Sequence, residues 1–382
     1  MKRADVAITG AGPAGSVAAL ILARAGLRVV LFDKSDGGEF RVGESLPPDA
    51  RLVLKPLGLL EQLEAGPHLR AYANRSAWGA EGLGSNDFIF NPYGHGWRLD
   101  RRAFNSMLAG AAEAAGATLL RSTRFVAASE TSGGWALELD AGGRAESCRV
   151  NFVFDCSGRD ATFAQKRGAR RITYDRLVGV VALSAPAAEG DADSATLVEA
   201  AAYGWWYTAL LPCGRRVTVY HTDADLLRVP PARLAETWPT LLGRTEHVRG
   251  VHERYGYELV GSPRVVAANS SRLDLVKGGG WLAAGDAAAA FDPLSSQGIM
   301  SAMRAGANAA GCYLAHRLGE PTALEDYAAH LDAVYDEYLS AHAAFYAQAA
   351  GRHESPFWAR RSAGRLTGRS LSPKSARRDK ET

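Results

Sequence analysis

The segment from Asp5 to Lys34 reads DVAITGAGPAGSVAALILARAGLRVVLFDK, and it largely determines the fold of the chain. A short β-branched run, residues 6–9, stops at Gly10, and Gly12 and Gly15 complete the pattern G-x-G-x-x-G. Residues 16–25 then carry apolar side chains at helical spacing, and residues 27–32 form a second apolar strand that ends at Asp33. The order strand, glycine turn, helix and strand predicts a βαβ unit.

Each of the three glycines in this turn is needed for a separate physical reason. Gly10 permits the tight strand-to-helix turn, Gly12 lets a pyrophosphate approach the backbone, and Gly15 lets helix and strand pack closely. The helix N-terminus offers free N–H groups and a partial positive charge to phosphates. Asp33 is placed to accept a hydrogen bond from a ribose hydroxyl. A glycine-rich turn of another α/β protein is the alternative. The strand, the helix, the second strand and the acid at its end all occur at the expected spacing, which favours dinucleotide binding.

The composition excludes several other classes of protein. With 382 residues, 47% of them hydrophobic, the chain can form one large domain or two interleaved domains. We find no run of about 18 apolar residues, so no membrane span is expected. The first strand begins within a few residues of the N-terminus, which predicts no signal peptide. Four cysteines without paired spacing predict a reduced, cytoplasmic protein.

The net charge of +3 comes from the end of the chain. Residues 360–382 contain eight Lys or Arg against two Asp or Glu, so the remainder is mildly acidic and nothing favours a nucleic acid as partner. The Ser- and Arg-rich tail is expected to be disordered, with partner docking as an alternative role, and Pro356 and Phe357 should mark the end of the ordered chain.

Three further segments end strands or begin helices where a ligand could bind. Gly43-Glu44-Ser45 precedes a helix opened by Pro47-Pro48, and its backbone groups would lie near a cofactor phosphate or ring. Asp155-Cys156-Ser157-Gly158 is a small-residue turn at the carboxyl end of a strand. Gly285-Asp286 ends another strand, where Asp286 could bond a polyol hydroxyl. The helix that begins near residues 295–298 offers N–H groups.

Residues 178–259 are rich in strand patterns and contain the aromatic hairpin YGWWYTALLPCGRRVTVYHTD, residues 203–223. Alternation places Trp205 and Tyr207 on one face of the hairpin and Trp206 on the other, so each face should cover something. We expect a core on one side and a cofactor or substrate on the other. His221 and Glu199 are candidate acid or base groups on this sheet, with a structural role as the alternative. The aromatic segment 88–97 is expected to form a strand and turn at a pocket or in the core.

Three motifs together resemble the glutathione-reductase-type FAD fold of the p-hydroxybenzoate-hydroxylase class, over nearly the whole chain. They are Gly10–Gly15 with Asp33, Arg101-x-x-Phe104, and Gly285-Asp286 with Asp292-Pro293 and Gly298. The resemblance implies an α/β (overall α+β) fold: a Rossmann-type FAD-binding domain with an inserted, mostly antiparallel β-sheet substrate domain and a C-terminal helical segment. The expected parts are FAD-binding segments 1–80, 98–176 and 264–322, a substrate-side strand 81–97, a substrate sheet 177–263, C-terminal helices 323–358 and a basic tail 359–382.

The same resemblance assigns residues to a non-covalent FAD. Asp33 would bind the adenosine ribose, Arg101 would lie along the diphosphate, and Asp286 would bind the ribityl chain, with Pro293 and residues 297–299 beside the isoalloxazine ring. The expected cofactor-binding residues are Gly10, Gly12, Pro13, Ala14, Gly15, Asp33, Lys34, Glu44, Ser45, Arg101, Arg124, Phe125, Ser157, Gly158, Gly285, Asp286, Pro293, Gln297, Gly298 and Ile299. The expected catalytic residues are Trp205, Tyr207, His221 and Gln297, and no metal ligand is expected.

Within that class, the segments 43–45, 155–158 and 292–294 are similar to those of flavin-dependent halogenases and their non-halogenating relatives. Halogenases of this type hold hypohalite on a lysine downstream of the Gly-Glu-Ser segment, but this chain has no lysine between Lys55 and Lys166, which disfavours halogenation. Four segments taken together, GESLPP (43–48), GWWYTALLP (204–212), TDAD (222–225) and GDAAAAFDPLSSQG (285–298), resemble a group of flavoproteins that includes maturases of cysteine tryptophylquinone enzymes, which hydroxylate a tryptophan side chain of a partner protein.

The resemblance implies an FAD-dependent monooxygenase that hydroxylates an electron-rich aromatic group through a flavin C4a-(hydro)peroxide formed with O2. Its substrate would be an aromatic small molecule or a tryptophan-containing protein or peptide. We find no second G-x-G-x-x-G, so electrons from NAD(P)H are expected to arrive through a separate flavin reductase. The alternatives are an FAD-dependent reductase of a polyprenyl or other small molecule, which the aromatic hairpin disfavours, and a non-enzymatic flavoprotein that binds a partner.

Overall fold

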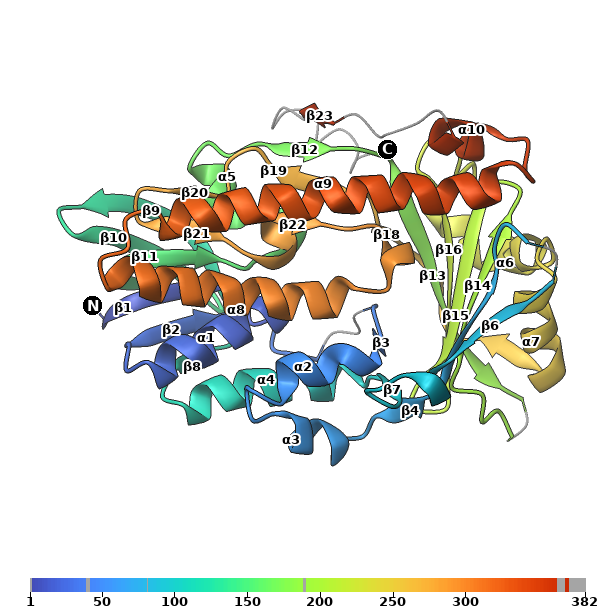
Figure 1. Ribbon diagram of the computed structural model, residues 1–382, viewed down its shortest axis with the longest axis horizontal. Coiled ribbons are helices and arrows are strands. Elements are labelled where there is room, and N and C mark those ends of the chain that lie inside the picture. The colour runs from blue at the N-terminus through green and yellow to red at the C-terminus, as the bar shows by residue number, and fades with distance from the viewer. Residues whose placement is uncertain (1, 39–41, 81, 188–189, 363–367, 371–382) are drawn as a thin grey trace.

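The computed structural model of the chain describes residues 2–38, 42–80, 82–187, 190–362 and 368–370. Two large β-sheets lie side by side along the long axis of the molecule, and the C-terminal helix α9 (Ala323–Ala350) runs across both of them (Figure 1). The predicted fold class is confirmed: a nucleotide-type parallel sheet with its helices stands beside a mostly antiparallel sheet. Among the helices of the described residues, none has the length and apolar character that crossing a membrane requires.

The first sheet is built on the N-terminal βαβ unit. Strand β1 lies between β2 and β11 in parallel register, and β2 and β11 pair in parallel with β8 and β21. The hairpin β9–β10 and the short strand β20 extend the sheet in antiparallel fashion. The strands are β1 (Lys2–Thr9), β2 (Val29–Phe32), β8 (Thr118–Leu120), β9 (Thr123–Thr131), β10 (Gly134–Ala141), β11 (Arg144–Asp155), β20 (Lys277–Gly278) and β21 (Trp281–Ala283).

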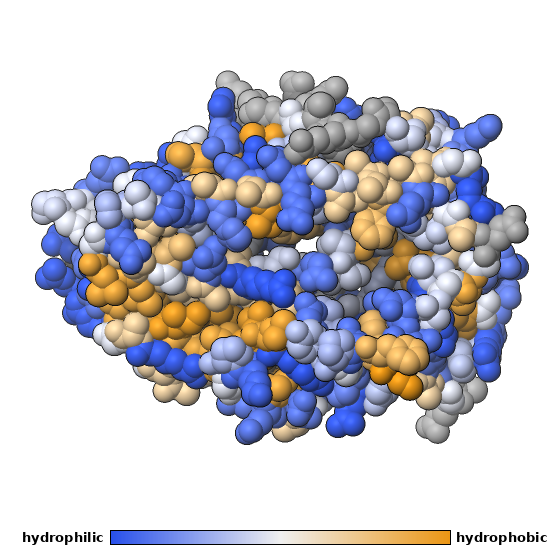
Figure 2. All heavy atoms as spheres, in the orientation of Figure 1, coloured by the Kyte–Doolittle hydropathy of each residue, from blue (hydrophilic) through white to orange (hydrophobic). Residues whose placement is uncertain are grey.

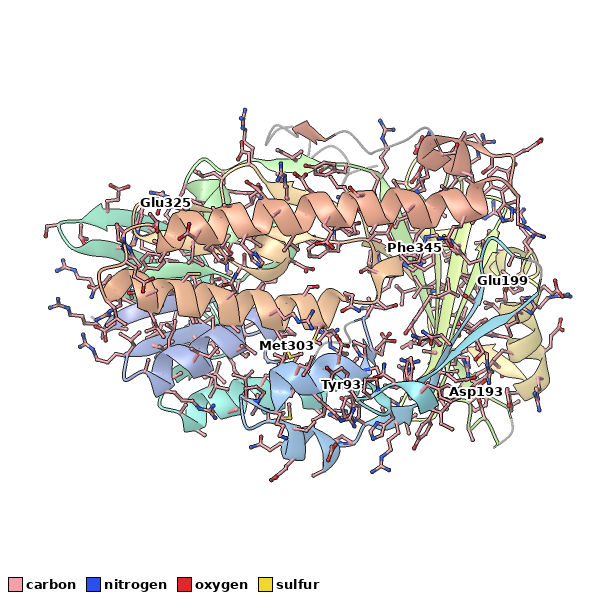
Figure 3. All side chains as sticks on the ribbon, in the orientation of Figure 1. Tyr93, Asp193, Glu199, Met303, Glu325 and Phe345 are labelled. Atoms are coloured by element: carbon pink, nitrogen blue, oxygen red, sulfur yellow. The ribbon has the colours of Figure 1, made fainter. Side chains whose placement is uncertain are left out.

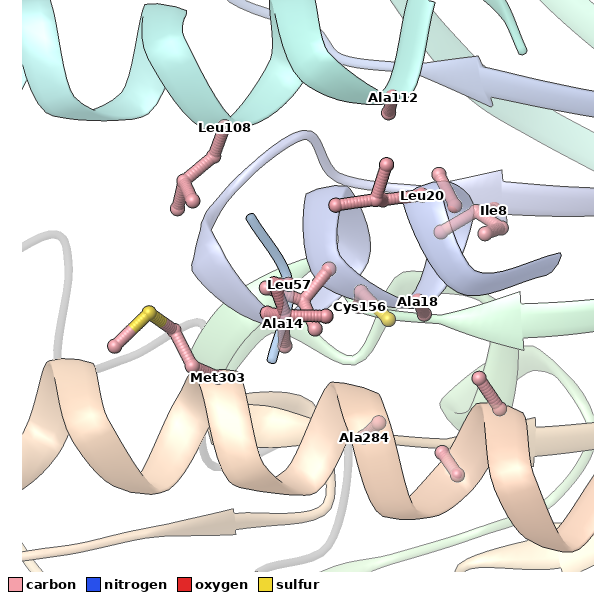
Figure 4. Close-up of a cluster of buried hydrophobic side chains, with 14 of the residues drawn as sticks. Ile8, Ala14, Ala18, Leu20, Leu57, Leu108, Ala112, Cys156, Ala284 and Met303 are labelled. Carbon is pink, nitrogen blue, oxygen red and sulfur yellow. The ribbon is translucent and has the colours of Figure 1, made fainter. Parts of the chain in front are cut away.

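Helices α1 (Pro13–Arg24), α4 (Arg101–Ala114) and α8 (Gly298–Arg317) pack together on the first sheet. Figure 4 shows the apolar side chains between them, among them Leu20, Leu108 and Met303. A Cβ atom built at Gly306 of α8 would lie 2.1 Å from the carbonyl oxygen of Ala14, so only glycine permits this close helix crossing. The crossing fixes the N-termini of α1 and α8 relative to each other.

Short helices complete this half of the molecule. They are η1 (Pro48–Ala50), α2 (Arg51–Leu54), α3 (Leu60–Glu64), η3 (Gly158–Asp160), α5 (Thr162–Lys166), η5 (Gly285–Ala287) and η6 (Pro293–Ser295). Two small sheets join them: β3 (Ser45–Leu46), β7 (Gly96–Arg98) and β4 (Leu69–Ala71) form one, and β22 (Ala289–Ala290), β19 (Ser271–Leu273), β12 (Arg171–Thr173) and β23 (Arg369–Ser370) form the other.

The large second sheet has the strand order β17-β13-β16-β15-β14-β5-β6, with β18 paired to β13. Its strands are β5 (Ala73–Ala77), β6 (Gly84–Asp87), β13 (Leu177–Pro186), β14 (Thr196–Ala201), β15 (Gly204–Leu210), β16 (Arg216–Asp223), β17 (Tyr257–Leu259) and β18 (Arg264–Ala267). Strands β5 and β18 belong to this sheet because β5 pairs in parallel with the distant β14 and β18 pairs with β13. Both strands lie outside the ranges 81–97 and 177–263 that were expected to hold the substrate-side strands.

The two faces of this sheet have different neighbours. On the outer face, Trp206 packs against Trp238 of α6 (Leu234–Leu242) and near Val248 of α7 (His247–Tyr255), with η4 (Pro231–Arg233) beside them. On the inner face, Trp205 packs in a different cluster with Tyr346 of α9. The predicted alternation of the aromatic hairpin is therefore confirmed.

The aromatic segment 88–97 contains a turn at residues 92–93 and the start of strand β7. Residues 88–90 form a 3-10 turn, η2 (Phe88–Phe90), which projects Ile89 and Phe90 into solvent, 82% and 91% exposed. Phe88 and Trp97, at the two ends, are buried. Of the two expected places, the core is therefore correct for Phe88 and Trp97, and neither residue lines the cavity described below.

The chain also stays ordered beyond the predicted end at Phe357. Helix α10 (Pro356–Ser362) buries Phe357 and Trp358, and two of the arginines counted in the basic tail lie within it. Arg360 and Arg361 pair with Asp223 of β16 at 2.8 and 2.7 Å. The expected disorder from residue 359 is therefore wrong for residues 359–362. The rest of that expectation concerns residues 363–382, of which only 368–370 are described.

Candidate FAD and substrate site

A cavity of about 750 Å³ lies between the two large sheets, and Figure 2 shows a hollow at the centre of this face of the molecule. Its wall begins at the glycine turn of β1 and ends at the inner face of the second sheet, at Trp205, Tyr207 and His221. This volume is within the range of small-molecule and cofactor sites. One continuous space therefore joins residues that the sequence assigned to a cofactor with residues that it assigned to a substrate.

The glycine turn forms one end of the cavity. Gly10 has φ +97°, a conformation that favours glycine, and a Cβ at Gly15 would lie 1.9 Å from the carbonyl oxygen of Gly10. A Cβ at Gly12 would instead meet no described atom within 4 Å, and Gly12 lines the cavity at the N-cap of α1. No described side chain caps α1, so its first N–H groups can bind a diphosphate.

Asp33 lies at the end of β2, on the cavity wall. Its Oδ2 accepts a hydrogen bond from the backbone N–H of Ala11 at 2.7 Å, and its Oδ1 accepts one from Ser35 at 2.8 Å. These bonds fix the carboxylate beside the glycine turn, where a ribose would follow the diphosphate. Lys34 next to it pairs with Asp160 at 2.8 Å, and both residues line the cavity.

Arginine side chains and a second small-residue turn form the middle of the wall. The Arg101 guanidinium donates to the carbonyl oxygens of Val42 and Gly43, at 2.8 and 2.6 Å, and so fixes the segment before Glu44. Arg124 pairs with Asp140 at 2.8 Å, and its neighbour Phe125 lines the same cavity.

Asp155 organises the turn that contains Ser157 and Gly158. This buried carboxylate accepts hydrogen bonds from the Ser157 hydroxyl at 2.6 Å and from the backbone N–H groups of Phe163 and Ala164, both at 2.8 Å. Ser157 and Gly158 are thereby held at the cavity wall, at the carboxyl end of β11. Ligands of open α/β sheets bind at this edge.

A second open helix N-terminus lies at the far side of the nucleotide half. Asp286, Pro293, Gly298 and Ile299 line the cavity. Gly298 is the first residue of the 20-residue helix α8, and a Cβ built there would meet no atom of the described residues within 4 Å. Two helix N-termini thus face one space, an arrangement that suits a ligand with a diphosphate and a ring that becomes negatively charged on reduction.

The substrate end of the cavity is aromatic. The rings of Trp205 and His221 stack with centroids 3.8 Å apart and planes 14° apart, and both rings belong to the cavity wall. Burial lowers the pKa of His221 to about 3, so this imidazole is neutral at ordinary pH. Val181, Val219 and Val266 complete an apolar surface beside them. The wall offers a flat aromatic surface that includes one neutral imidazole.

A polar edge lies next to this aromatic face. The Tyr207 hydroxyl lies 3.3 Å from Glu44 Oε2 and 3.1 Å from Ser45 Oγ, and Arg98 donates to Ser45 at 2.8 Å. Glu44 is 2% exposed, and burial raises the pKa of its carboxyl group. Glu44 and Ser45, which the sequence analysis assigned to the cofactor, therefore contact the tyrosine that it assigned to catalysis.

Four predicted residues are not brought into the cavity. Gly15 and Gly285 lie behind the wall, where they allow close packing, and Gln297 lies at the N-cap of α8 without lining the cavity. Glu199 faces the outer side of the second sheet (Figure 3). It accepts hydrogen bonds from the backbone N–H groups of residues 246–248 and so caps α7. The structural alternative holds for Glu199.

The sequence patterns did not single out the side chains that hold the turn at Asp292–Pro293. Asp292 is buried and lines the cavity, and three side chains of α9 surround it: Tyr338, His342 and Tyr346. The spacing of four residues between them places them on one face of the helix, and this polar aromatic stripe was the available signal. The helical spacing of residues 323–348 predicted the helix, but it did not indicate which residue this face would contact.

Comparisons with known proteins agree with this geometry. A family described as FAD binding domain matches residues 3–339. LodB of Marinomonas mediterranea, named as an FAD-dependent oxidoreductase, is 26% identical over 374 residues, 95% of this chain and 98% of LodB. Among solved structures, the flavin-dependent halogenase CmlS has a TM-score of 0.82 at 25% identity, covering all of this chain and 70% of CmlS. QhpG, a peptidyl tryptophan dihydroxylase essential for tryptophylquinone cofactor biogenesis, has a TM-score of 0.76 at 24% identity, covering 94% and 78% of the two chains.

Proposed function

The chain belongs to the FAD-binding-domain family of flavin-dependent oxidoreductases, and from this premise we propose that it is a monooxygenase that hydroxylates an electron-rich aromatic ring. One atom of O2 enters the ring as a hydroxyl group in place of a hydrogen atom, and the other is reduced to water, with two electrons from NAD(P)H and two protons consumed in all. The single observation that carries the proposal is the continuous cavity, which runs from the nucleotide-binding turn to the stacked pair Trp205–His221.

FAD fits the nucleotide half of this cavity. The open N-terminus of α1 at Gly12 would hold the diphosphate, Asp33 the ribose, and the N-terminus of α8 at Gly298 the flavin ring. When bound and reduced, FAD supplies the electrons that activate O2. The protein contributes the binding, the orientation of the substrate ring and the exclusion of water.

The substrate half suits a flat aromatic ring. Trp205 and His221 present a ring face against which an aromatic substrate can stack, and three valines exclude water around it. His221 is neutral, because burial disfavours its protonated form, so its ring serves as a stacking surface rather than as a proton acceptor. Tyr207, held by Glu44 and Ser45, can orient a polar group of the substrate.

We further propose a tryptophan side chain of a partner protein or peptide as the substrate. An indole has the size, the electron-rich ring and the single N–H group that this aromatic and polar wall can receive. The fold likeness to QhpG, which acts on a peptidyl tryptophan, supports this choice. Electrons would reach FAD through a separate flavin reductase, because the sequence has one G-x-G-x-x-G motif and it belongs to the FAD site.

Halogenation is the second candidate, since the halogenase CmlS is also similar in structure. Among the cavity-lining residues in the described part of the chain, the one lysine is Lys34, which pairs with Asp160 near the glycine turn. A lysine that could carry an electrophilic halogen to Trp205 and His221 is thus missing from the described wall. This arrangement favours hydroxylation.

The test is an assay with the FAD-loaded protein, a flavin reductase, NADH, ¹⁸O2 and a tryptophan-containing peptide, in the presence of bromide. Mass spectrometry should find one ¹⁸O atom in the peptide, whereas bromine in the product would establish the halogenase. If neither atom enters the peptide or a panel of phenols and indoles, while a polyprenyl substrate is reduced, the monooxygenase proposal is wrong. The assay with NADPH but no reductase should give little product.

A matched pair of histidine variants tests the substrate half. His221→Gln removes the ring that stacks on Trp205, so product formation should fall by about a hundredfold through loss of substrate orientation, while reoxidation of the flavin continues. His252→Gln is the control, because His252 is also buried in this half of the molecule but bonds Thr218 and does not line the cavity. Equal activities of the two variants would contradict the role of His221.

A further inference from the structure

Helix α9 reaches the turn at the flavin end of the cavity through one set of side chains, the Asp292 cluster: Asp292, Tyr338, His342 and Tyr346. Tyr338, His342 and Tyr346 recur every four residues and so share one face of α9, the helix that spans both halves of the molecule (Figure 1). All three hydrogen-bond to Asp292, which is 1% exposed.

Each polar atom of Asp292 has a partner. Its backbone N–H donates to Tyr338 Oη at 2.9 Å, and its Oδ1 accepts from the N–H of Leu294 at 2.8 Å. Its Oδ2 accepts from Tyr346 Oη at 2.8 Å and lies 3.1 Å from His342 Nε2. Burial alone would raise the pKa of Asp292, but these donors outweigh burial and lower it, so Asp292 is an ionised acceptor.

The same tyrosine also bonds the substrate wall. The Trp205 indole Nε1–H donates to Tyr346 Oη at 2.8 Å, and that hydroxyl donates to Asp292. Asp292 is the N-cap of η6 and precedes Pro293, while Trp205 stacks on His221. A single buried hydroxyl therefore connects the two walls of the cavity, one from the first half of the molecule and one from the second sheet.

We propose that Tyr346, supported by His342, is a positioning residue that fixes the flavin-side turn at Asp292–Pro293 relative to the aromatic wall at Trp205. The inference rests on the FAD site of the proposed function, but it does not depend on which reaction follows. Without the hydroxyl, Trp205 Nε1 and Asp292 Oδ2 each lose a partner in a buried place, and the turn and the wall lose their fixed separation.

The matched control is another tyrosine of the same helix. Tyr327 is also buried, and its hydroxyl donates to the carbonyl oxygen of Ala283 at 2.7 Å, outside the set of cavity-lining residues. Tyr327→Phe should therefore also remove a buried hydrogen bond of α9 and destabilise the fold, but without disturbing the cavity. The comparison separates a positioning role from a purely structural one.

The experiment measures the FAD dissociation constant and the visible circular dichroism of bound FAD, together with the urea midpoint of unfolding. Tyr346→Phe should weaken FAD binding about tenfold and change the dichroism of the flavin bands. Tyr327→Phe should stay within about twofold of the natural protein and leave the dichroism unchanged. Equal FAD binding and equal flavin spectra in the two variants would overturn the inference.

A double-mutant cycle tests the link itself. If Trp205 and Asp292 are connected through Tyr346, the effects of Trp205→Phe and Tyr346→Phe on FAD affinity should fall well short of additive. Additive effects would refute the connection. If Tyr346→Phe fails to fold, His342→Gln, which keeps an N–H donor for Asp292, and His342→Leu, which removes it, take its place. Loss of FAD affinity in the leucine variant alone supports the proposal, and equal affinities refute it.

The two proposals fail in different ways. Weak or absent FAD binding by the natural protein contradicts the cofactor site on which both proposals rest. Normal FAD binding with no oxygenated product contradicts only the monooxygenase. Normal FAD binding that responds equally to the Tyr346 and Tyr327 substitutions contradicts only the positioning role.

Discussion

Replacing Arg361 by methionine should destabilise the protein strongly, although charge composition assigns this residue to a solvated tail. Arg361 donates from Nη2 to Asp223 Oδ1 at 2.7 Å and from Nη1 to Oδ2 at 3.2 Å, and both side chains are 2% exposed. Its guanidinium also lies 3.8 Å from the ring centroid of Phe357. Methionine keeps much of the apolar volume but leaves the Asp223 carboxylate with one charged partner, Arg360.

The magnitude follows from the burial of the pair. Removing one partner of a buried ion pair costs about 3–5 kcal/mol, because the other charge stays buried without compensation. Arg360 still donates to Asp223 at 2.8 Å, so we expect about 2–4 kcal/mol for Arg361→Met. Arg360 is itself 42% exposed, and Arg360→Met should cost only about 0–1 kcal/mol.

Urea unfolding followed by tryptophan fluorescence measures both variants, and limited trypsin digestion reports on α10. The double variant Arg361→Met/Asp223→Leu should recover most of the lost stability, because no unpaired buried charge remains. If Arg361→Met is no more destabilising than Arg360→Met, the ion pair is not buried in solution and the reasoning from its geometry is refuted.

Three further predictions use other parts of the molecule. Gly12→Val should fill the diphosphate position and weaken FAD binding more than about a hundredfold, with an unchanged unfolding midpoint of the apoprotein. A fluorescence titration with FAD measures this affinity, and an unchanged affinity would contradict the proposed diphosphate site. Glu199→Gln should lower the free energy of unfolding by about 1–2 kcal/mol, because the charged cap accepts three N–H groups of α7; a urea series measures this cost, and a value near zero would refute the cap. Stability should fall as pH drops from about 6.5 toward 4, by up to about 1.4 kcal/mol per pH unit for each of His221 and His252. Their folded pKa values are about 3 and about 4, so the unfolded chain binds protons first; His252→Gln should reduce the slope of stability against pH, and an unchanged slope would refute its part.

Local patterns predicted the parts of the fold that neighbouring residues determine. The glycine turn, the alternation around Trp205 and Trp206, and the helix that became α9 all depend on spacing within one segment. Gly12 and Asp33 line the same cavity, because G-x-G-x-x-G and its acid lie within one βαβ unit, and their contact with FAD stays a prediction.

The missed features depend on partners far away in the sequence. Strand β5 joins the second sheet through β14, more than a hundred residues later. Asp292 is held by side chains that follow it by 46 to 54 residues. The basic tail was misassigned for a related reason: composition counts the charge of Arg361 but not the buried Asp223 that receives it. Tertiary pairing changes the meaning of a charge run, and a single sequence does not display that pairing.

The face of α9 that holds the turn has a consequence for the biosynthesis of the protein. During synthesis, Trp205 and Asp292 leave the ribosome before Tyr338, His342 and Tyr346, so the two walls of the cavity emerge well before the helix that fastens them. Stable FAD capture should therefore wait until α9 has emerged and docked. Stalled nascent chains that end before Ala323 should leave this region open to protease and retain no FAD. Chains that extend past α10 should resist the protease and retain FAD, so cofactor binding would be the last step of folding.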